Sequence, residues 1–480
     1  MSVGRRAASA LGFPAHGIDP LAPLAAFVHL LGGAAEHLLI ILVLWMVLKR
    51  VLPRLLRWLW RCGVGTRLRL GLVGALPLLV RAARRRQRIR ARSWFDGEKL
   101  LVGYDARLRP VEIQLLSDSG GRHFLVLGAA GSGKTVTMTW IAVRAIERGL
   151  PVVVIDPKDD PDLRRQLCRA ARAAGRRLIE WTPEGPSVFN PLAQGQDGEV
   201  ADKALAGETF TEPHYMRQAQ RYIGHAVRML RSAGGETSIA ALAEQLVPER
   251  LEVLLRSLPR SEATTATEAY LDALTQRQRS DLSGVRDRLA IVAESDVGRW
   301  LNPATPDAPR FDLLSALRSR AVVLFRLRSD QRPMLMRMVG AAIFLDLQTT
   351  MAALQASPLR SVAVIDEFAA LSAGQVGGLF GRARGAGMSL VLGTQELADL
   401  ELAGGPGLRK QVTGNITGLI AHRQVDHDSA EWVSRFSGIE ALELRALAQG
   451  CAAVVGHAGH GRRTRLDARL ARMLSARELG

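Results

Sequence analysis

The stretch FLVLGAAGSGKTVTM, Phe124–Met138, decides the fold of this 480-residue chain, because it combines an expected strand, a glycine-rich turn and an expected helix. Residues 124–127 are apolar and β-prone, whereas residues 136–146 carry apolar side chains at helical spacing. Between them, GAAGSGKT at 128–135 fits the phosphate-loop pattern without a mismatch. Motif and context agree, so the sequence predicts that a nucleoside triphosphate binds here.

The residue types of this loop suit phosphate binding. Glycine lets backbone N–H groups curl around phosphate oxygens, and the N-terminus of the following helix adds a partial positive charge. The Lys134 side chain can reach the β- and γ-phosphates, and the Thr135 hydroxyl can ligate magnesium. An ordinary glycine turn is the alternative, and the flanking strand and helix patterns argue against it. The predicted nucleotide-binding residues are Gly128, Ala129, Ala130, Gly131, Ser132, Gly133, Lys134 and Thr135.

A second part of the site is expected where the apolar strand Val362–Ile365 is followed by two carboxylates. Asp366 would hold magnesium, directly or through water, and Glu367 would orient and deprotonate the attacking water. Gln395 ends the next predicted strand, 388–395, and parallel strands end at one edge of a sheet. Its amide can therefore sense the γ-phosphate or position water, with a plain strand-end cap as the alternative.

Three further groups of residues are open to two interpretations. Arg382 and Arg384 lie beside glycines in GRARGAGM and fit either a trans-acting arginine finger or a solvated helix face. DPKDD at 156–160 follows a predicted strand and fits either a role in the site or a charged turn. The histidines show no metal-ligand spacing and are interpreted as surface or core residues. They are His422, His427, His457 and His460.

Composition and charge restrict the class of protein. Apolar residues make up 48% of the chain, which argues against disorder, and three widely spaced cysteines form neither a disulfide framework nor a zinc cluster. The net charge is +18, but Lys49–Arg92 alone holds fourteen Lys and Arg and no acidic residue, which leaves +4 elsewhere. The bulk charge therefore does not by itself indicate DNA binding.

A candidate membrane span precedes this basic block. Leu30–Leu48 is long enough, at about 19 residues, to cross the hydrocarbon core, although Glu36 and His37 interrupt its first half. A buried core helix or an amphipathic surface helix is the alternative. Leu70–Val80 is too short for a second span, which would also place the basic loop outside. We expect one span, with the N-terminus outside and most of the chain in the cytoplasm.

Strand and helix patterns alternate from about residue 94, as βαβ units require, whereas 197–317 shows mainly helical patterns. The predicted fold class is α/β: a RecA-like P-loop NTPase with a mostly parallel sheet, a helical insertion domain and an N-terminal transmembrane helix. The predicted divisions are an N-terminal segment 1–26, a transmembrane helix 27–48, a basic juxtamembrane segment 49–93, ATPase parts 94–196 and 318–460, an all-helical insertion domain 197–317 and a basic C-terminal helix 461–480.

The ordered motifs resemble those of the TraG/TraD-like coupling proteins of conjugation and type IV secretion, within the FtsK/HerA-like motor group. They are HFLVLGAAGSGKT, IDPKDD, FNPL, VIDEFAAL, GRARGAGMSLVLGTQ and NITGLIAHR, between about residues 95 and 460. The resemblance implies a hexameric, inner-membrane ATPase of bacteria that uses ATP and Mg²⁺. Such proteins pass DNA–relaxase complexes or effector proteins to a type IV secretion channel.

The resemblance also assigns roles to individual residues. Asp366 matches the family's magnesium ligand, Glu367 its catalytic carboxylate and Gln395 its sensor glutamine. Arg384 falls where the family often has a trans-acting arginine. Two departures stand out: Asp159 occupies a position where glycine is usual, and the family usually has two membrane spans.

Three functions follow as hypotheses. The first is a membrane-anchored ATP-hydrolysing coupling protein that recruits DNA, as a relaxase complex, and drives or gates its transfer. The second is a coupling receptor for effector proteins. The third is a docking component whose ATP binding only gates assembly, against which the intact Lys134, Glu367 and Gln395 argue.

Overall fold

The computed structural model describes residues 45–46, 49, 64–118, 120–207, 210, 212–372, 378–456 and 467–476. Apart from Trp45 and Met46, the predicted transmembrane helix 27–48 lies outside these residues. Among the helices described, none combines the length and the apolar character needed to cross a bilayer. The chain divides into two units at Arg81 and Ala82, and the basic helix α2, Val64–Arg90, begins in the first unit and ends in the second.

Seven parallel strands form the centre of a 12-stranded sheet, in the order β12-β4-β11-β10-β5-β9-β6. Their Val-, Ile- and Leu-rich runs are buried on both faces, as strands between two helical layers require. The predicted mostly parallel α/β sheet is therefore confirmed. The strands are β4 His123–Leu127, β5 Val152–Asp156, β6 Leu178–Trp181, β9 Val322–Arg326, β10 Ser361–Ile365, β11 Met388–Thr394 and β12 Gly418–Ala421.

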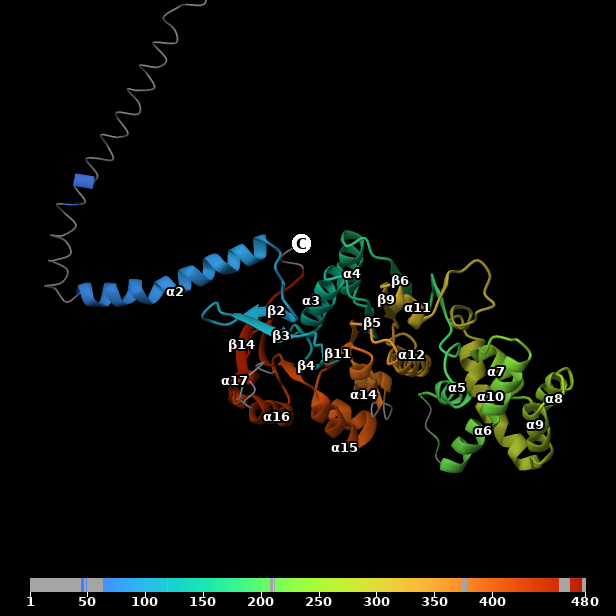
Figure 1. Ribbon diagram of the computed structural model, residues 1–480. Helices are drawn as coiled ribbons and strands as arrows, with labels where there is room; N and C mark the ends of the chain where they lie inside the picture. The colour runs from blue at the N-terminus through green and yellow to red at the C-terminus, as the bar shows by residue number, and fades with distance from the viewer. Residues whose placement is uncertain are drawn as a thin grey trace, which may run out of the picture. The chain divides into compact units, whose positions relative to one another are not determined.

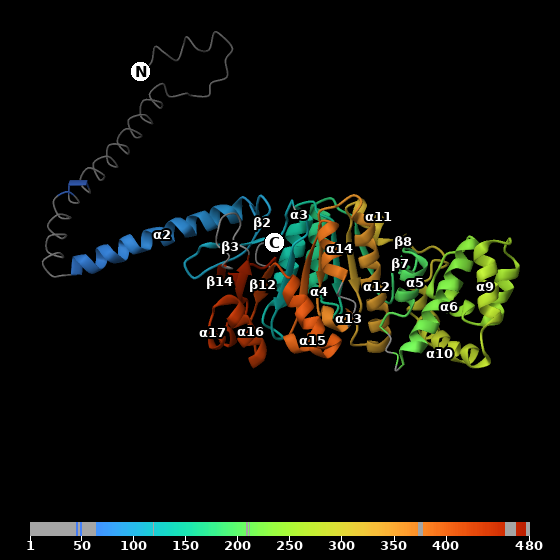
Figure 2. The same ribbon diagram turned by 60° about the horizontal axis from the view of Figure 1, so that its bottom comes forward.

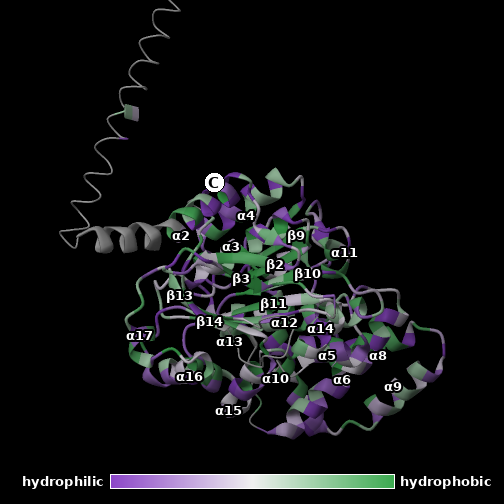
Figure 3. Ribbon diagram, turned by 60° about the vertical axis from the view of Figure 1, so that its left-hand side comes forward, coloured by the Kyte–Doolittle hydropathy of each residue, from purple (hydrophilic) through white to green (hydrophobic). Residues whose placement is uncertain are grey.

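Helices cover both faces of this sheet, so successive side chains enter two different cores. In β5, Val152 and Val154 pack with α3 and α4, whereas Val153 and Ile155 pack with α12 to α15. Figure 1 shows α3 and α4 on one side of the strands and α14 and α15 on the other, and Figure 3 shows the hydrophobic character of the sheet between more hydrophilic helices. The helices are α3 Lys134–Glu147, α4 Pro161–Ala173, α12 Pro333–Leu354, α13 Phe368–Ser372, α14 Leu379–Gly385 and α15 Leu397–Asn415.

The other end of the sheet is antiparallel and contains a correction to the sequence prediction. The predicted basic C-terminal helix 461–480 is wrong over Asp467–Met473, which form strand β14 between β13 and β2. Ala471 and Met473 are buried and Arg472 between them is exposed, as in a strand. Pairing with two open sheet edges overrides the helical preference of this segment. The remaining elements here are β1 Phe95–Asp96, β2 Lys99–Tyr104, β3 Pro110–Gln114, β13 Cys451–Gly456, α16 His427–Ser437 and α17 Ala441–Arg445.

The segment predicted as an insertion is mainly helical and joins the core through α5 and α12, which lie side by side in Figure 2. At this junction the Lys203 Nζ lies 2.6 Å from the Asp346 Oδ1, and both side chains are at most 2% exposed. The expected turn FNPL begins with Phe189, the last residue of the short strand β7, which pairs with β8. The elements are β7 Val188–Phe189, α5 Asp197–Ala204, α6 Pro213–Ser232, α7 Ile239–Gln245, α8 Pro248–Arg256, α9 Glu262–Asp272, α10 Gln276–Ala293, the 3-10 helix η2 Gly298–Trp300, β8 Arg310–Phe311 and α11 Leu313–Arg318.

Candidate nucleotide-binding site

The glycine-rich segment forms the turn between β4 and α3. The backbone φ is +71° at Gly131 and +111° at Gly133, in the left-handed region that favours glycine. Gly133 is also the N-cap of α3, and it offers no side-chain acceptor to the helix. The first N–H groups of α3 have no intrahelical acceptor either, so they are available to an anion.

His422, the residue directly after strand β12, packs against this turn. A Cβ at Gly128 would lie 2.7 Å from both the His422 Cβ and the Ser132 Oγ, so the turn fits only with glycine at this position. The Ser132 Oγ is buried and has no hydrogen-bond partner among the described residues. A cradle that a Cβ would fill, with an unsatisfied polar atom inside it, fits a phosphate group.

His422 joins the turn to β13 and is a core residue, as one of the two sequence interpretations had it. Its Nδ1 lies 3.1 Å from the Cys451 carbonyl oxygen, which can only accept, so the Nε2 accepts from the Thr137 hydroxyl at 3.0 Å. Burial lowers the pKa of His422 to about 4, which keeps the ring neutral. His427 is exposed on α16, and the part of the chain described contains no group of residues that could hold a metal through histidine.

The two carboxylates that follow β10 meet the start of α3. The Thr135 hydroxyl donates to the Asp366 Oδ2 at 3.1 Å. The Lys134 ammonium group contacts the Asp366 Oδ1 and lies 2.9 Å from the Glu367 Oε1. Hydroxyl and carboxylate oxygens are the ligand types that Mg²⁺ takes in proteins, so Thr135 and Asp366 fit a magnesium ion between them.

Three donors surround a single oxygen of Glu367. The Oε1 lies 2.9 Å from the Lys134 Nζ and 2.8 Å from the Lys158 Nζ, and it accepts from the Gln395 Nε2 at 3.0 Å. The backbone φ of Glu367 is +45°, a conformation that is costly for a residue with a side chain. Strain of this kind is found mainly at functional sites, where surrounding contacts hold it in place.

The charges of Lys134 and Glu367 shift each other's pKa. Burial alone would raise the pKa of Glu367, but the Lys134 and Lys158 ammonium groups hold it below its ordinary value. Burial alone would lower the pKa of Lys134, but Asp366 and Glu367 hold it above its ordinary value. Lysine and glutamate are therefore both charged at neutral pH, although the Lys134 side chain is only 6% exposed.

The DPKDD segment forms a charged turn and also reaches the site. Asp156 accepts hydrogen bonds from the N–H groups of Lys158 and Asp160, at 3.0 and 2.7 Å. Burial raises the pKa of Asp156 to about 6, although these hydrogen bonds oppose the shift. Asp159 has a φ of +61°, which explains why glycine suits this position, and its carboxylate contacts Arg326 and Arg328. The sequence did not predict the contact of Lys158 with Glu367; its only signal was the place of the turn at the end of β5.

Arg384 lies apart from the other predicted site residues. It is near the end of α14, which comes before β11, whereas Gln395 comes directly after β11. A seven-residue strand spans about 20 Å, so the two side chains lie at opposite edges of the sheet. The Arg384 side chain is exposed and makes no hydrogen bond or ion pair with any described residue, although its backbone carbonyl accepts from the N–H groups of Gly121 and Gly387. The structure therefore brings together Lys134, Thr135, Asp366, Glu367 and Gln395, but not Arg384.

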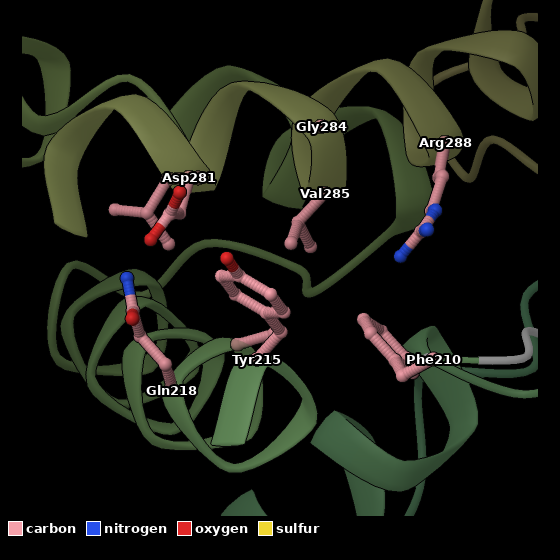
Figure 4. A pocket seen from close by; sticks show the side chains of 9 residues that line it. Phe210, Tyr215, Gln218, Asp281, Gly284, Val285 and Arg288 are labelled. Atoms are coloured by element: carbon pink, nitrogen blue, oxygen red, sulfur yellow. The ribbon is translucent and has the colours of Figure 1, made fainter. Parts of the chain in front are cut away.

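A cavity of about 160 Å³ lies in the helical insertion, between α6 and α10 (Figure 4). Tyr215 and Gln218 project into it from α6, and Asp281 and Val285 from α10. All its lining residues belong to the insertion, so it is separate from the phosphate loop.

Comparison with known proteins places this geometry in a family. Residues 110–466 match the family described as "Type IV secretion-system coupling protein DNA-binding domain". An uncharacterized protein of Mycoplasma pneumoniae is 32% identical over 120 residues, which is 24% of this chain and 80% of that protein.

Solved structures share the fold at low sequence identity. The bacterial conjugative coupling protein TrwBΔN70 is 18% identical, with a TM-score of 0.56, over 76% of this chain and 87% of that one. VirB4 of Thermoanaerobacter pseudethanolicus is 15% identical, with a TM-score of 0.58, over 80% and 98%. The plasmid coupling protein TrwB in complex with ADP and Mg²⁺ is 19% identical, with a TM-score of 0.56, over 75% and 86%.

Proposed function

We propose that this chain, which belongs to the type IV secretion-system coupling protein family, hydrolyses ATP and uses the reaction to drive or gate the transfer of DNA. One observation carries the proposal. Residues from three separate segments, Lys134 with Thr135, Asp366 with Glu367, and Gln395, meet within hydrogen-bond distance at one edge of the sheet. That set contains a phosphate-binding lysine, two magnesium-ligand types, a base and an amide.

The chain's own groups account for each requirement of the reaction. The N–H groups at the start of α3 and the Lys134 ammonium group bind phosphate oxygens, and Thr135 and Asp366 would hold magnesium. Magnesium there would neutralise the negative charge that develops in the transition state. Glu367 accepts a proton from the water whose oxygen bonds to the γ-phosphorus, while Gln395 orients that water. The bond from the γ-phosphorus to the β-phosphate oxygen breaks, which yields ADP and inorganic phosphate.

Similar proteins support the choice of nucleotide and metal. TrwB is described in complex with ADP and Mg²⁺ and with ATP and GTP analogues. We propose ATP and Mg²⁺ for this chain, with DNA as the cargo because the matched family is described as a DNA-binding domain. A relaxase bound to the DNA would be the immediate partner.

We also propose that the chain is anchored in the bacterial inner membrane and works as a homo-hexamer with its ATPase domain in the cytoplasm. The apolar run Leu30–Leu48 and the fourteen basic residues of Lys49–Arg92 support the anchor, because basic residues favour the cytoplasmic side of a span. Components of the type IV secretion apparatus would be the partners in the membrane.

The proposal is tested by ATP hydrolysis of the full chain in lipid nanodiscs, with and without single-stranded or double-stranded DNA. We expect hydrolysis that DNA stimulates, and that both Lys134→Ala and Glu367→Gln abolish. Lys134→Ala should also lose nucleotide binding, whereas Glu367→Gln should keep it, because only Lys134 contacts phosphate. Lys410→Ala, at an exposed lysine of α15, is the matched control and should behave as wild type.

Each alternative has its own result in this assay. Hydrolysis that no DNA changes would argue against DNA cargo and favour effector proteins. Nucleotide binding without hydrolysis, in the hexamer, would contradict a motor and favour ATP-gated docking.

A further inference from the structure

Lys158 is a charged residue of the candidate site that belongs to neither the phosphate loop nor the carboxylate pair Asp366 and Glu367. It comes from the turn between β5 and α4, and its Nζ lies 2.8 Å from the Glu367 Oε1. Strands β5 and β10 are neighbours in the sheet, with Ile155 opposite Ile365. The turn that follows one strand therefore lies beside the residues that follow the other, and topology alone brings lysine and glutamate together.

The backbone around Lys158 is fixed from both sides. The buried Asp156 carboxylate accepts the N–H groups of Lys158 and Asp160, which closes the turn. Asp159, in its left-handed conformation, is held by Arg326 and by Arg328, whose Nε lies 2.6 Å from its Oδ2. The lysine stem therefore starts from a set position, even though the Lys158 side chain is 52% exposed.

Two ammonium groups contact the Glu367 oxygen, and they differ in what competes for them. Lys134 begins α3 within the phosphate loop, where phosphate oxygens compete with Asp366 and Glu367 for its three N–H donors. Lys158 lies outside the loop, so phosphate binding leaves its charge beside Glu367. The Glu367 backbone, with a φ of +45°, lies in the sparsely populated left-handed region, as residues of functional sites often do.

We infer that Lys158 is a positioning residue for ATP hydrolysis, which holds the Glu367 carboxylate in place while Lys134 binds phosphate. The inference rests on the proposed ATPase function. The charged groups that face Glu367 are Lys134 from α3, Lys158 from the β5–α4 turn and its own neighbour Asp366, and Gln395 adds a neutral donor.

The first test compares kcat and KM for ATP, for the full chain in nanodiscs, between wild type, Lys158→Met, Lys158→Arg and the exposed-lysine control Lys410→Met. We expect Lys158→Met to lower kcat about tenfold or more, with KM for ATP little changed because the phosphate contacts remain. Lys158→Arg keeps a cation at the end of a long side chain, so it should restore most of kcat, and Lys410→Met should match wild type.

The second test does not depend on hydrolysis. Thermal unfolding midpoints are measured for wild type, Lys158→Met, Glu367→Gln and the double variant, without nucleotide. Residues in contact give non-additive changes, so we expect the double variant to differ from the sum of the two single changes. Lys410→Met combined with Glu367→Gln should be additive.

The outcomes separate this inference from the proposed function. A wild-type chain without ATPase activity overturns the proposed function, and with it the positioning role, whatever the melting data show. An active wild type whose kcat is unchanged by Lys158→Met, or melting changes that add, overturns the inference about Lys158 alone.

Discussion

Gly128 is the residue at which the phosphate loop and the sheet come closest. Its missing side chain leaves room for the His422 Cβ, and the His422 ring joins α3 to β13 through Thr137 and Cys451. The shape of the loop therefore depends on a core histidine far away in the sequence. Asp159 and Glu367 show a related dependence, because their left-handed backbones lie where their carboxylates contact residues far away in the sequence.

We expect Gly128→Ala to lower both nucleotide affinity and stability. The added methyl group would lie 2.7 Å from two atoms, so the loop must shift, at a cost of about 1–3 kcal/mol. Nucleotide titration and urea unfolding measure the two effects. Gly414→Ala is the control, because its Cβ would enter open space near the end of α15. A Gly128→Ala chain with wild-type affinity would contradict the steric argument.

The sequence predicts the position of a residue well where that residue follows a strand with a strong apolar pattern. Lys134, Asp366 and Gln395 could be placed at one sheet edge because each lies just past or near the end of an apolar run. Lys158 could not be paired with Glu367, since the direction of a lysine stem depends on the turn that Asp156 closes and on the left-handed backbone of Asp159. Neither feature has a local sequence pattern.

Helices α5 and α12 connect the helical insertion to the sheet. The ion pair Lys203–Asp346 links these two helices and is buried, and the Lys203 Nζ also donates to the Gln194 carbonyl oxygen at 2.8 Å. Burial raises the pKa of Asp346 to about 6, although Lys203 opposes the shift. A pair of this kind is costly to break from one side only, because the remaining charge is left without a partner.

We expect Lys203→Met to destabilise the protein by ~3–5 kcal/mol at pH 8, where Asp346 is ionised and would lose its partner. Folding raises the pKa of Asp346 from about 4 to about 6, so the native state binds the proton more tightly than the unfolded state. The stability that this group contributes therefore falls as the pH rises from about 4 through about 6. Without Lys203 that pKa rises further, so the loss should be much smaller at pH 5.

Urea unfolding at the two pH values measures this difference. The double variant Lys203→Met with Asp346→Leu should recover much of the stability at pH 8, because it removes the unpaired carboxylate as well. An equal loss at pH 5 and pH 8 would show that charge is not the cause.

Strand β14 is an element that its local sequence pattern does not predict. Strand β14 is rich in Ala, Leu, Arg and Met, which favour helices, and the sequence accordingly predicted a helix there. Its backbone groups instead complete β13 and β2, whose edges would otherwise be unpaired. The central strands were predictable for the opposite reason, since continuous Val, Ile and Leu runs suit a buried parallel sheet in any surroundings.

On the scale of the whole molecule, the sheet separates the candidate site from Arg384. Asp366, Glu367 and Gln395 lie at the carboxyl edge of the strands, and Arg384 lies at the amino edge. An arginine that makes no ion pair with the described residues of its own chain is suited to a second copy of the protein. We therefore propose that Arg384 has the trans-acting role within a ring that the family resemblance implies.

We expect Arg384→Ala to abolish ATP hydrolysis and to leave nucleotide binding unchanged, because the site of its own chain stays complete. Mixing inactive Arg384→Ala chains with inactive Glu367→Gln chains should restore part of the activity, since some interfaces then combine an intact arginine with an intact glutamate. The ATPase rate of the mixture measures this rescue. A mixture as inactive as its components would contradict action in trans.

The pairing of β14 with β2 has a consequence for synthesis. Tyr104 emerges early from the ribosome, but its partner in the sheet is Arg472. At ~5–20 residues per second, strand β2 waits roughly 20–70 s until β14 has been synthesised. Over that time β2 has an unpaired edge toward β14, because β3 pairs with its other edge, and this edge is open to pairing with another protein.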